Sequence, residues 1–169
     1  MISTERLLQI LNQGAHRTVP LMVEEIHCNF RHPQYHNIYI SDKRSKEAII
    51  FDGVQYKTVY IDEAIEELDT KMKSHITDRF YIVEGLLHNE EKFLEKFSEK
   101  DKKMIEKRLR TLNDYEDDCP EQKKSNQYVR YTLCDYKDII KNTRKKLEKN
   151  LSNRKKLAST QQLNITPTI

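Results

Sequence analysis

One short segment of β-type sequence constrains the fold most. Asn37–Ser41 and Gln55–Tyr60 alternate apolar and polar residues, whereas Ala48–Phe51 is apolar and partly β-branched. The Asp52-Gly53 dipeptide separates the second run from the third. It is a strong type I′ hairpin signal, because glycine adopts positive φ at little cost. The segment therefore predicts a small three-stranded antiparallel meander, which needs a covering helix to be stable.

The residues before the meander have helical character. Leucines share one face of Ser3–Asn12, and Gly14 follows as a C-terminal stop. Apolar residues then recur at helical spacing, which predicts a second helix over residues 19–28. Thr18 is the expected N-cap of this helix, and Pro20 falls in its first turn, where the missing N–H costs nothing. These two helices are expected to cover the sheet.

The residues after the meander are also helical in pattern. Asp62 is the expected N-cap of a helix whose apolar stripe starts at Ile65 and continues through Leu86. A short helix is expected around residues 93–97, and Ser98 or Asp101 caps another that ends at Leu112.

The predicted fold class is α+β, with a small three-stranded antiparallel meander and N-terminal helices, followed by a mainly helical C-terminal half. We expect five parts: a helix-helix-meander module at 1–61, an acidic helical region at 62–115, a linker at 116–125, a long basic helix at 126–157 and a tail at 158–169.

The net charge of +3 conceals an asymmetry along the chain. Residues 1–61 carry 7 basic and 6 acidic side chains, residues 62–120 carry 11 and 17, and residues 121–169 carry 12 and 4. An acidic middle followed by a basic end indicates that the end meets something anionic.

Eight cations lie within sixteen residues of the basic end, opposed only by Glu148: Lys141, Arg144, Lys145, Lys146, Lys149, Arg154, Lys155 and Lys156. On a helix many of them share overlapping faces, and phosphate backbones bind such stripes through counterion release. They are our candidate nucleic-acid-binding residues. The main alternative is a solvated helix face that pairs with the acidic region, in cis or across a dimer, or with an acidic protein surface.

Three histidines and a cysteine crowd the loop that precedes the meander. Cys28, His32 and His36 offer thiolate and imidazole donors at a spacing that suits zinc. A structural zinc site usually takes four ligands, so His27 or a distant cysteine would have to complete it. We favour the interpretation that the histidines shape a polar loop through backbone hydrogen bonds, and we expect no cofactor.

The same loop imitates half of a His-Asn-His nuclease, which uses a general-base histidine on a hairpin, an orienting asparagine and a metal-binding histidine on a following helix. His27 is the candidate base. After Ile40, however, comes another hairpin rather than that helix, and His75 and His88 lie far along the chain. We therefore predict no catalytic residues and no enzyme activity.

Three cysteines, Cys28, Cys119 and Cys134, are odd in number and widely spaced, which indicates free thiols in a reducing compartment. No apolar run approaches the roughly 20 residues that span a bilayer, so we expect no membrane partner. The first residues are too polar for a signal peptide.

The segment VPLMVEEIHCNFRHPQYHNIYISDKRSKEAIIFDGVQYKTV resembles a domain of proteins from large nucleocytoplasmic DNA viruses, where it commonly follows a two-Cys, two-His zinc finger. The matching residues are Ile26, His27, Asn29, His32, Pro33, His36, Asn37, Ile38, Tyr39, Ile40, Phe51, Asp52 and Gly53. This chain begins just before the domain, and Tyr56 stands where relatives often place a tryptophan after the turn. The resemblance implies kinship and brings no biochemical role with it.

These observations together predict a non-enzymatic accessory protein of a large DNA virus. Its basic C-terminal helix would bind nucleic acid or a nucleoprotein assembly, in the host cytoplasm or nucleus at the viral factory. The alternative is a structural virion component, such as a minor capsid or internal cementing protein, with self-association. A His-Asn-His-like nuclease is the third hypothesis.

Overall fold

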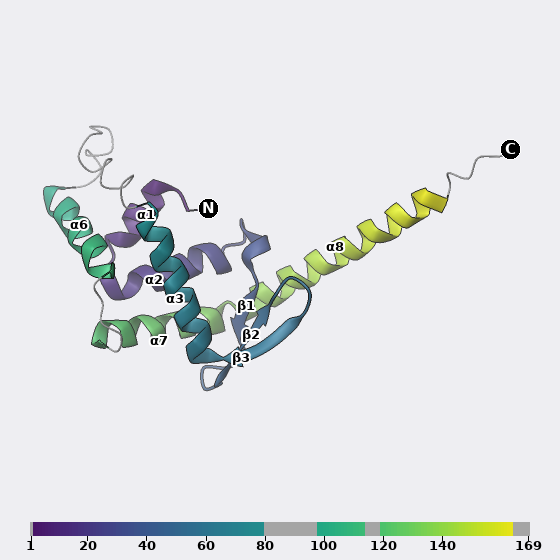
Figure 1. Cartoon of the computed structure of the whole chain (residues 1–169), viewed down its shortest axis with the longest axis horizontal. Helices are drawn as coiled ribbons and strands as arrows, with labels where there is room; N and C mark the ends of the chain where they lie inside the picture. The colour runs from purple at the N-terminus through teal and green to yellow at the C-terminus, as the bar shows by residue number, and fades with distance from the viewer. Residues whose placement is uncertain (1, 80–97, 114–118, 164–169) are drawn as a thin grey trace.

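The computed structural model describes residues 2–79, 98–113 and 119–163, without the side chains of 112–113 and 154–163. It confirms the α+β class: a three-stranded antiparallel sheet, N-terminal helices and a helical C-terminal half (Figure 1). The predicted helical features at residues 80–97 and the terminal residues 164–169 lie outside the described residues.

Two helices open the fold. Helix α1 spans Thr4–Leu11, and its N-cap Ser3 accepts a hydrogen bond from the Arg6 amide, as expected for a capping serine. Helix α2 spans Ala15–Val23, so it begins earlier than predicted. Gly14 at φ +125° is its N-cap, which corrects the assignment of Thr18. Thr18 instead lies inside the first turn, where its hydroxyl donates to the Gly14 carbonyl.

The α2 helix contains Pro20 in its interior and continues as a π-helical turn, η1, over Glu24–Cys28. A 3₁₀ turn, η2, follows at Pro33–Tyr35. The second helical segment was therefore predicted at the right place, but with the wrong start and without its change of helical form.

The sheet confirms the predicted meander. Strands β1 (Ile38–Ile40), β2 (Glu47–Phe51) and β3 (Tyr56–Tyr60) are antiparallel in the order β1-β2-β3, and Ile38 pairs with Ile50.

The β2–β3 hairpin differs from the predicted type I′ turn. Phe51 pairs with Tyr56, so four residues form the loop rather than two. A carboxylate oxygen of Asp52 accepts hydrogen bonds from the amides of Val54 and Gln55, at 2.9 Å each. Gly53 adopts φ +104°. The aspartate therefore stabilises a wider loop, while the glycine supplies the positive φ that the sequence indicated.

Helix α3 spans Ile61–Thr77 and begins one residue before the predicted N-cap. Tyr60 is the N-cap, so Asp62 lies in the first turn, where its charge still faces the positive end of the helix dipole. The predicted apolar stripe is buried from Ile65 to Ile76.

Helix α6 spans Glu99–Asn113, and Ser98, one of the two predicted caps, immediately precedes it. The Asp101 amide donates to the Ser98 hydroxyl at 3.2 Å, and the Ser98 amide donates to an Asp101 carboxylate oxygen at 3.1 Å. This reciprocal arrangement is a capping box.

The predicted linker and the predicted single long helix are both wrong in part. Helix α7 spans Pro120–Asp135, with Cys119 as its N-cap, so the second half of the 116–125 segment is helical. Helix α8 spans Lys137–Leu163 and extends into the segment expected to be a tail. Tyr136 separates the two helices, and its hydroxyl donates to a Glu24 carboxylate oxygen at 2.7 Å. This tertiary contact stabilises the interruption between α7 and α8. The sequence pattern did not reveal that interruption.

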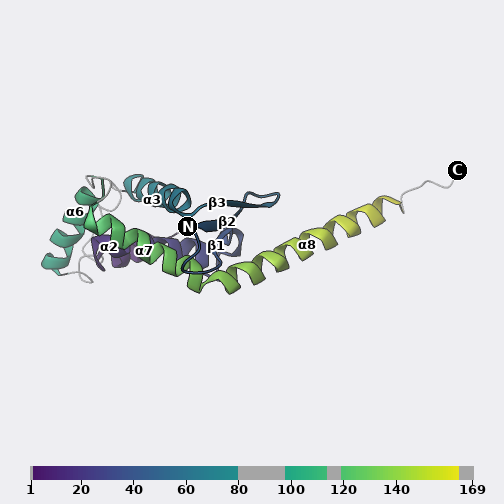
Figure 2. The ribbon, with the colours of Figure 1, turned by 90° about the horizontal axis from the view of Figure 1, so that it is seen from below.

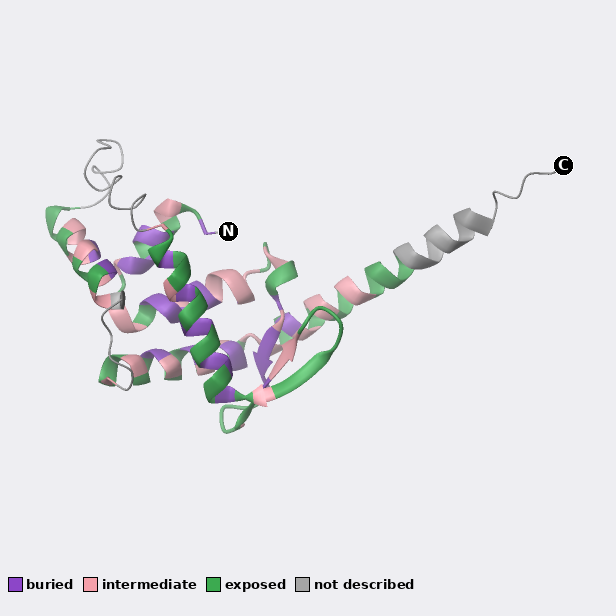
Figure 3. Ribbon diagram, viewed as in Figure 1, coloured by how far each residue is buried: buried purple, intermediate pink, exposed green. Residues whose placement is uncertain are grey.

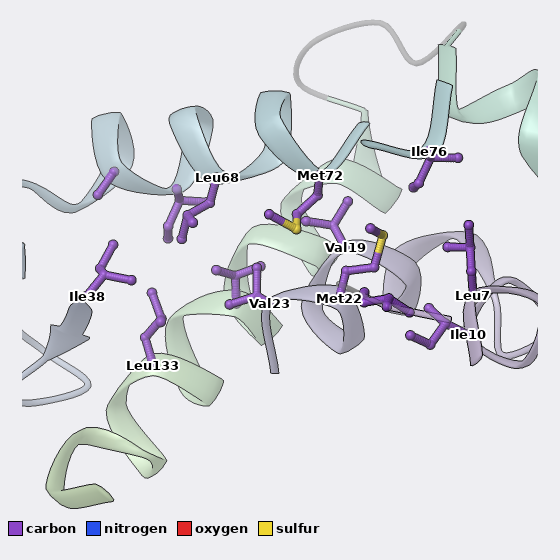
Figure 4. Close-up of a cluster of buried hydrophobic side chains, with 14 of the residues drawn as sticks. Leu7, Ile10, Val19, Met22, Val23, Ile38, Leu68, Met72, Ile76 and Leu133 are labelled. Carbon is purple, nitrogen blue, oxygen red and sulfur yellow. The ribbon is translucent and has the colours of Figure 1, made fainter. Parts of the chain in front are cut away.

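The two halves of the chain share one core. Figure 4 shows Val19 and Val23 of α2 beside Met72 of α3 and Leu133 of α7, with Ile38 of β1 at one end. The buried faces of the helices turn towards this centre, whereas much of α8 lies outside it (Figure 3). No helix within the described residues is long and apolar enough to cross a membrane.

Candidate functional site

Helix α8 is anchored at its beginning and projects beyond the body (Figures 1 and 2). Its first turns contact β1, α7 and the turns η1 and η2. Ile140 is fully buried there with Cys28 and Tyr39, and the Lys141 ammonium lies 4.9 Å from the centroid of the Tyr39 ring. The start of the predicted basic helix is therefore part of the folded body.

Arg144, one of the candidate nucleic-acid-binding residues, belongs to this anchor. Its guanidinium donates to the backbone carbonyls of His36 at 3.2 Å and Gln34 at 3.3 Å. The same group lies 4.5 Å from the centroid of the Phe51 ring, within cation–π range. Two of its nitrogens and its flat face are thus engaged inside the protein.

Lys145, Lys146 and Lys149 are arranged differently, since all three are exposed. At about 100° per residue, helix geometry turns them to the side opposite Ile140 and Arg144. We call them the outer lysines. Residues 137–153, the part of α8 whose side chains are described, include six basic and two acidic residues. The side chains of Arg154, Lys155 and Lys156 lie outside the described residues, although their backbone continues the helix.

The alternative in which the basic face pairs with the acidic region in cis has no support among the described side chains. No ion pair joins α8 to α3 or α6 there. Both views place α8 on the far side of the body from α6. Burial and the nearby charge of Glu148, the one acidic residue within the basic cluster, raise the pKa of Tyr56 on β3.

The histidine motif forms the framework of the loop beneath α8. His27 Nδ1 lies 3.0 Å from both the Tyr35 carbonyl and the Asn37 side-chain oxygen. His36 is completely buried, and its Nε2 lies 2.8 Å from the Asn29 carbonyl. Because both rings bond to the loop backbone, the geometry favours the interpretation that they shape the loop.

The proposed metal ligands do not come together. Within the residues that the structure describes, no group of three His, Cys, Asp or Glu side chains could hold a metal ion. Burial raises the pKa of the Cys28 thiol to about 12, which disfavours the thiolate that zinc requires. Cys28 packs with Ile140 and Tyr39, and His36 is directed to the Asn29 carbonyl.

Three histidines that the sequence did not link line one pocket of the structure. His27, His32 and His75 line one pocket of about 360 Å³ between η1, the loop and α3. His75 lies on α3, on the turn that also buries Met72 and Ile76. Nothing in the sequence pairs these distant positions. The only available signal was that His75 borders the apolar stripe of its helix.

The His27 ring has a defined protonation state in this pocket. Two oxygen acceptors at Nδ1 place the proton on that nitrogen, so Nε2 carries the lone pair. Burial lowers the pKa of His27, and the charge of Lys71 lowers it further, against the raising effect of the hydrogen bonds to Tyr35 and Asn37. The neutral ring is therefore favoured.

Comparison with known proteins adds no assignment, because no family model matches the chain and no curated protein or solved structure is significantly similar to it.

Proposed function

We propose that the protein binds nucleic acid through the projecting part of helix α8, without sequence preference. The observation that carries the proposal is the position of the outer lysines. Lys145, Lys146 and Lys149 are exposed, and no described acidic side chain pairs with them. Cations without protein partners are the groups that can contact phosphates and release the counterions condensed on a nucleic acid.

The shape of α8 suits a polyanion. From Lys145 to Leu163 the helix extends for about 28 Å, at roughly 1.5 Å per residue. A duplex presents one charge per about 1.7 Å of its axis, so this length faces more phosphates than the helix has cations. Contacts to phosphates supply affinity but no sequence information, which is why we propose general rather than specific binding.

From the resemblance of the sequence around the histidine motif, we further propose that the protein is an accessory protein of a large DNA virus and acts at the viral factory. If the protein is instead a virion component, the lysines of α8 would contact an acidic protein surface rather than nucleic acid. The salt dependence of binding to bare DNA separates the two hypotheses.

The test compares two triple variants of the full chain. The first replaces the three outer lysines with glutamine. The matched control replaces Lys100, Lys103 and Lys107, which are exposed on α6, and removes the same charge. Binding to a mixed-sequence duplex is measured by fluorescence anisotropy between 50 and 200 mM salt.

We expect the plot of log affinity against log salt to become shallower by about 2 to 3 in the outer-lysine variant, since each lost phosphate contact changes the slope by about 0.9. The α6 control should keep the slope of the unmodified chain. Equal losses in the two variants would show that only net charge matters. Absence of binding at 50 mM salt would overturn the proposal and favour a protein partner, as in a virion.

A further inference from the structure

The pocket that holds His27 has the size and lining of a ligand site. Its volume of about 360 Å³ lies within the range of about 300–1,000 Å³ typical of small-molecule pockets. Leu7, Met22, Ile26 and Met72 supply apolar walls from four different elements, α1, α2, η1 and α3. Methionine side chains adapt to varied apolar shapes, so two of them on facing helices suit a ligand that the protein must enclose.

One polar atom in this lining is available to a ligand and has a fixed character. His27 Nδ1 is engaged with Tyr35 and Asn37, and within the described residues Nε2 has no hydrogen-bond partner. A neutral imidazole held in this way presents an acceptor to the pocket. It would take a hydrogen bond from a hydroxyl or N–H group of the ligand.

The lining is cationic on balance. Among the described residues of the lining, Lys71 and Arg79 are the cations and Asp78 is the one carboxylate. Arg79 also donates to the Ile2 carbonyl, which fixes it beside the pocket. The Lys71 ammonium lies 2.5 Å from a Glu67 carboxylate oxygen on the solvent side, so it is positioned but not buried.

The geometry points to this pocket as the binding site of a small organic acid that has an apolar body and a hydrogen-bond donor. The body lies against Met22, Ile26 and Met72, the donor meets Nε2 of His27, and the acid group lies near Lys71. This site is separate from the outer lysines of α8, so the two activities can be tested independently.

Anilinonaphthalene sulfonate is a suitable probe, because it combines an aromatic body, an N–H donor and an anionic group. We would titrate the full chain with it and follow its fluorescence. The blocking variant is His75→Trp, which places a large side chain at an exposed position of the lining. The matched control is Thr70→Trp, an exposed position on the same helix outside the pocket.

We expect saturable binding of one probe per chain, abolished by His75→Trp and retained by Thr70→Trp. Lys71→Gln should weaken binding about threefold to tenfold, the effect of losing one solvent-exposed charged contact. The imidazole ¹⁵N spectrum gives a second readout, in which the Nε2 resonance of His27 should shift on binding while Nδ1 keeps its protonated position. Equal fluorescence in the two tryptophan variants, or an unchanged His27 spectrum at saturation, would overturn the inference.

Discussion

Replacing Arg144 with alanine separates its role as an anchor from the nucleic-acid role that the sequence suggested. The side chain joins α8 to the loop through the carbonyls of His36 and Gln34 and covers the ring of Phe51. The change should therefore lower the free energy of unfolding. It should leave the slope of DNA binding against salt almost unchanged, since the guanidinium is held against two carbonyls and a ring within the protein.

The magnitude follows from the three contacts. The bond to His36 is partly buried and that to Gln34 is exposed. Charged hydrogen bonds contribute about 1.5–3 kcal/mol, and solvent reduces the exposed one. The contact with Phe51 adds about 0.5–1 kcal/mol at such a half-exposed position. Because contacts of one side chain are not additive, we expect a loss of about 2–3 kcal/mol in total.

Urea denaturation followed by circular dichroism measures this loss, and Lys145→Ala is the matched control one residue along the same helix. The control should change stability by less than about 0.5 kcal/mol, since Lys145 is exposed and has no partner among the described residues. Arg144→Lys should recover only part of the loss, because an ammonium cannot serve two carbonyls and stack on a ring in the same geometry. Equal midpoints for Arg144→Ala and Lys145→Ala would refute the anchor.

Three further outcomes follow from burial. Leu133→Ala should lower the free energy of unfolding, measured by urea denaturation, by about 2–5 kcal/mol, because the Leu133 side chain on α7 is fully buried in the core. Leu151→Ala should leave that free energy nearly unchanged, because Leu151 is 58% exposed. With Ellman's reagent at pH 8, Cys28 should react only after denaturation, whereas the less buried Cys119 should react in the native chain; native reaction of Cys28 would contradict its burial. Because burial lowers the pKa of His27 from its ordinary value of 6.5, the unfolded chain takes up the proton first, so stability should fall as the pH drops below about 6.5. His27→Gln should reduce that fall, and an unchanged pH profile would contradict it.

The sequence was sufficient for the elements whose signals are local. Alternating residues and the Asp52-Gly53 dipeptide specified the meander, and Ser98 specified the start of α6, because pairing and capping depend on residues a few positions apart. The predicted turn type and the predicted N-cap of α2 were wrong, because in each case a side chain makes a contact that the sequence pattern does not reveal. Asp52 widened its own turn by bonding two amides, and Thr18 bonded to Gly14 from inside the helix.

The candidate site was less predictable, because its contacts join distant parts of the chain. A count of charges cannot distinguish Arg144 from Lys145, although one is bound to two carbonyls and the other is exposed. The difference arises from the direction in which the loop presents those carbonyls. In the same way, His75 of α3 and His27 line one pocket only because α3 packs on α2.

The loop that contains the histidine motif is joined to the basic helix α8 by hydrogen bonds. His36 is buried and bonds to the Asn29 carbonyl, which holds the loop with the His36 and Gln34 carbonyls facing α8. Arg144 bonds to both, while Tyr136 ties the start of the helix to η1 through Glu24. The contacts of Tyr136 and Arg144 are about two helical turns apart, so together they fix the direction of α8, whereas a single contact would allow the helix to rotate about it. The motif therefore bears on the proposed nucleic-acid binding without touching the ligand: it sets the direction in which the outer lysines point.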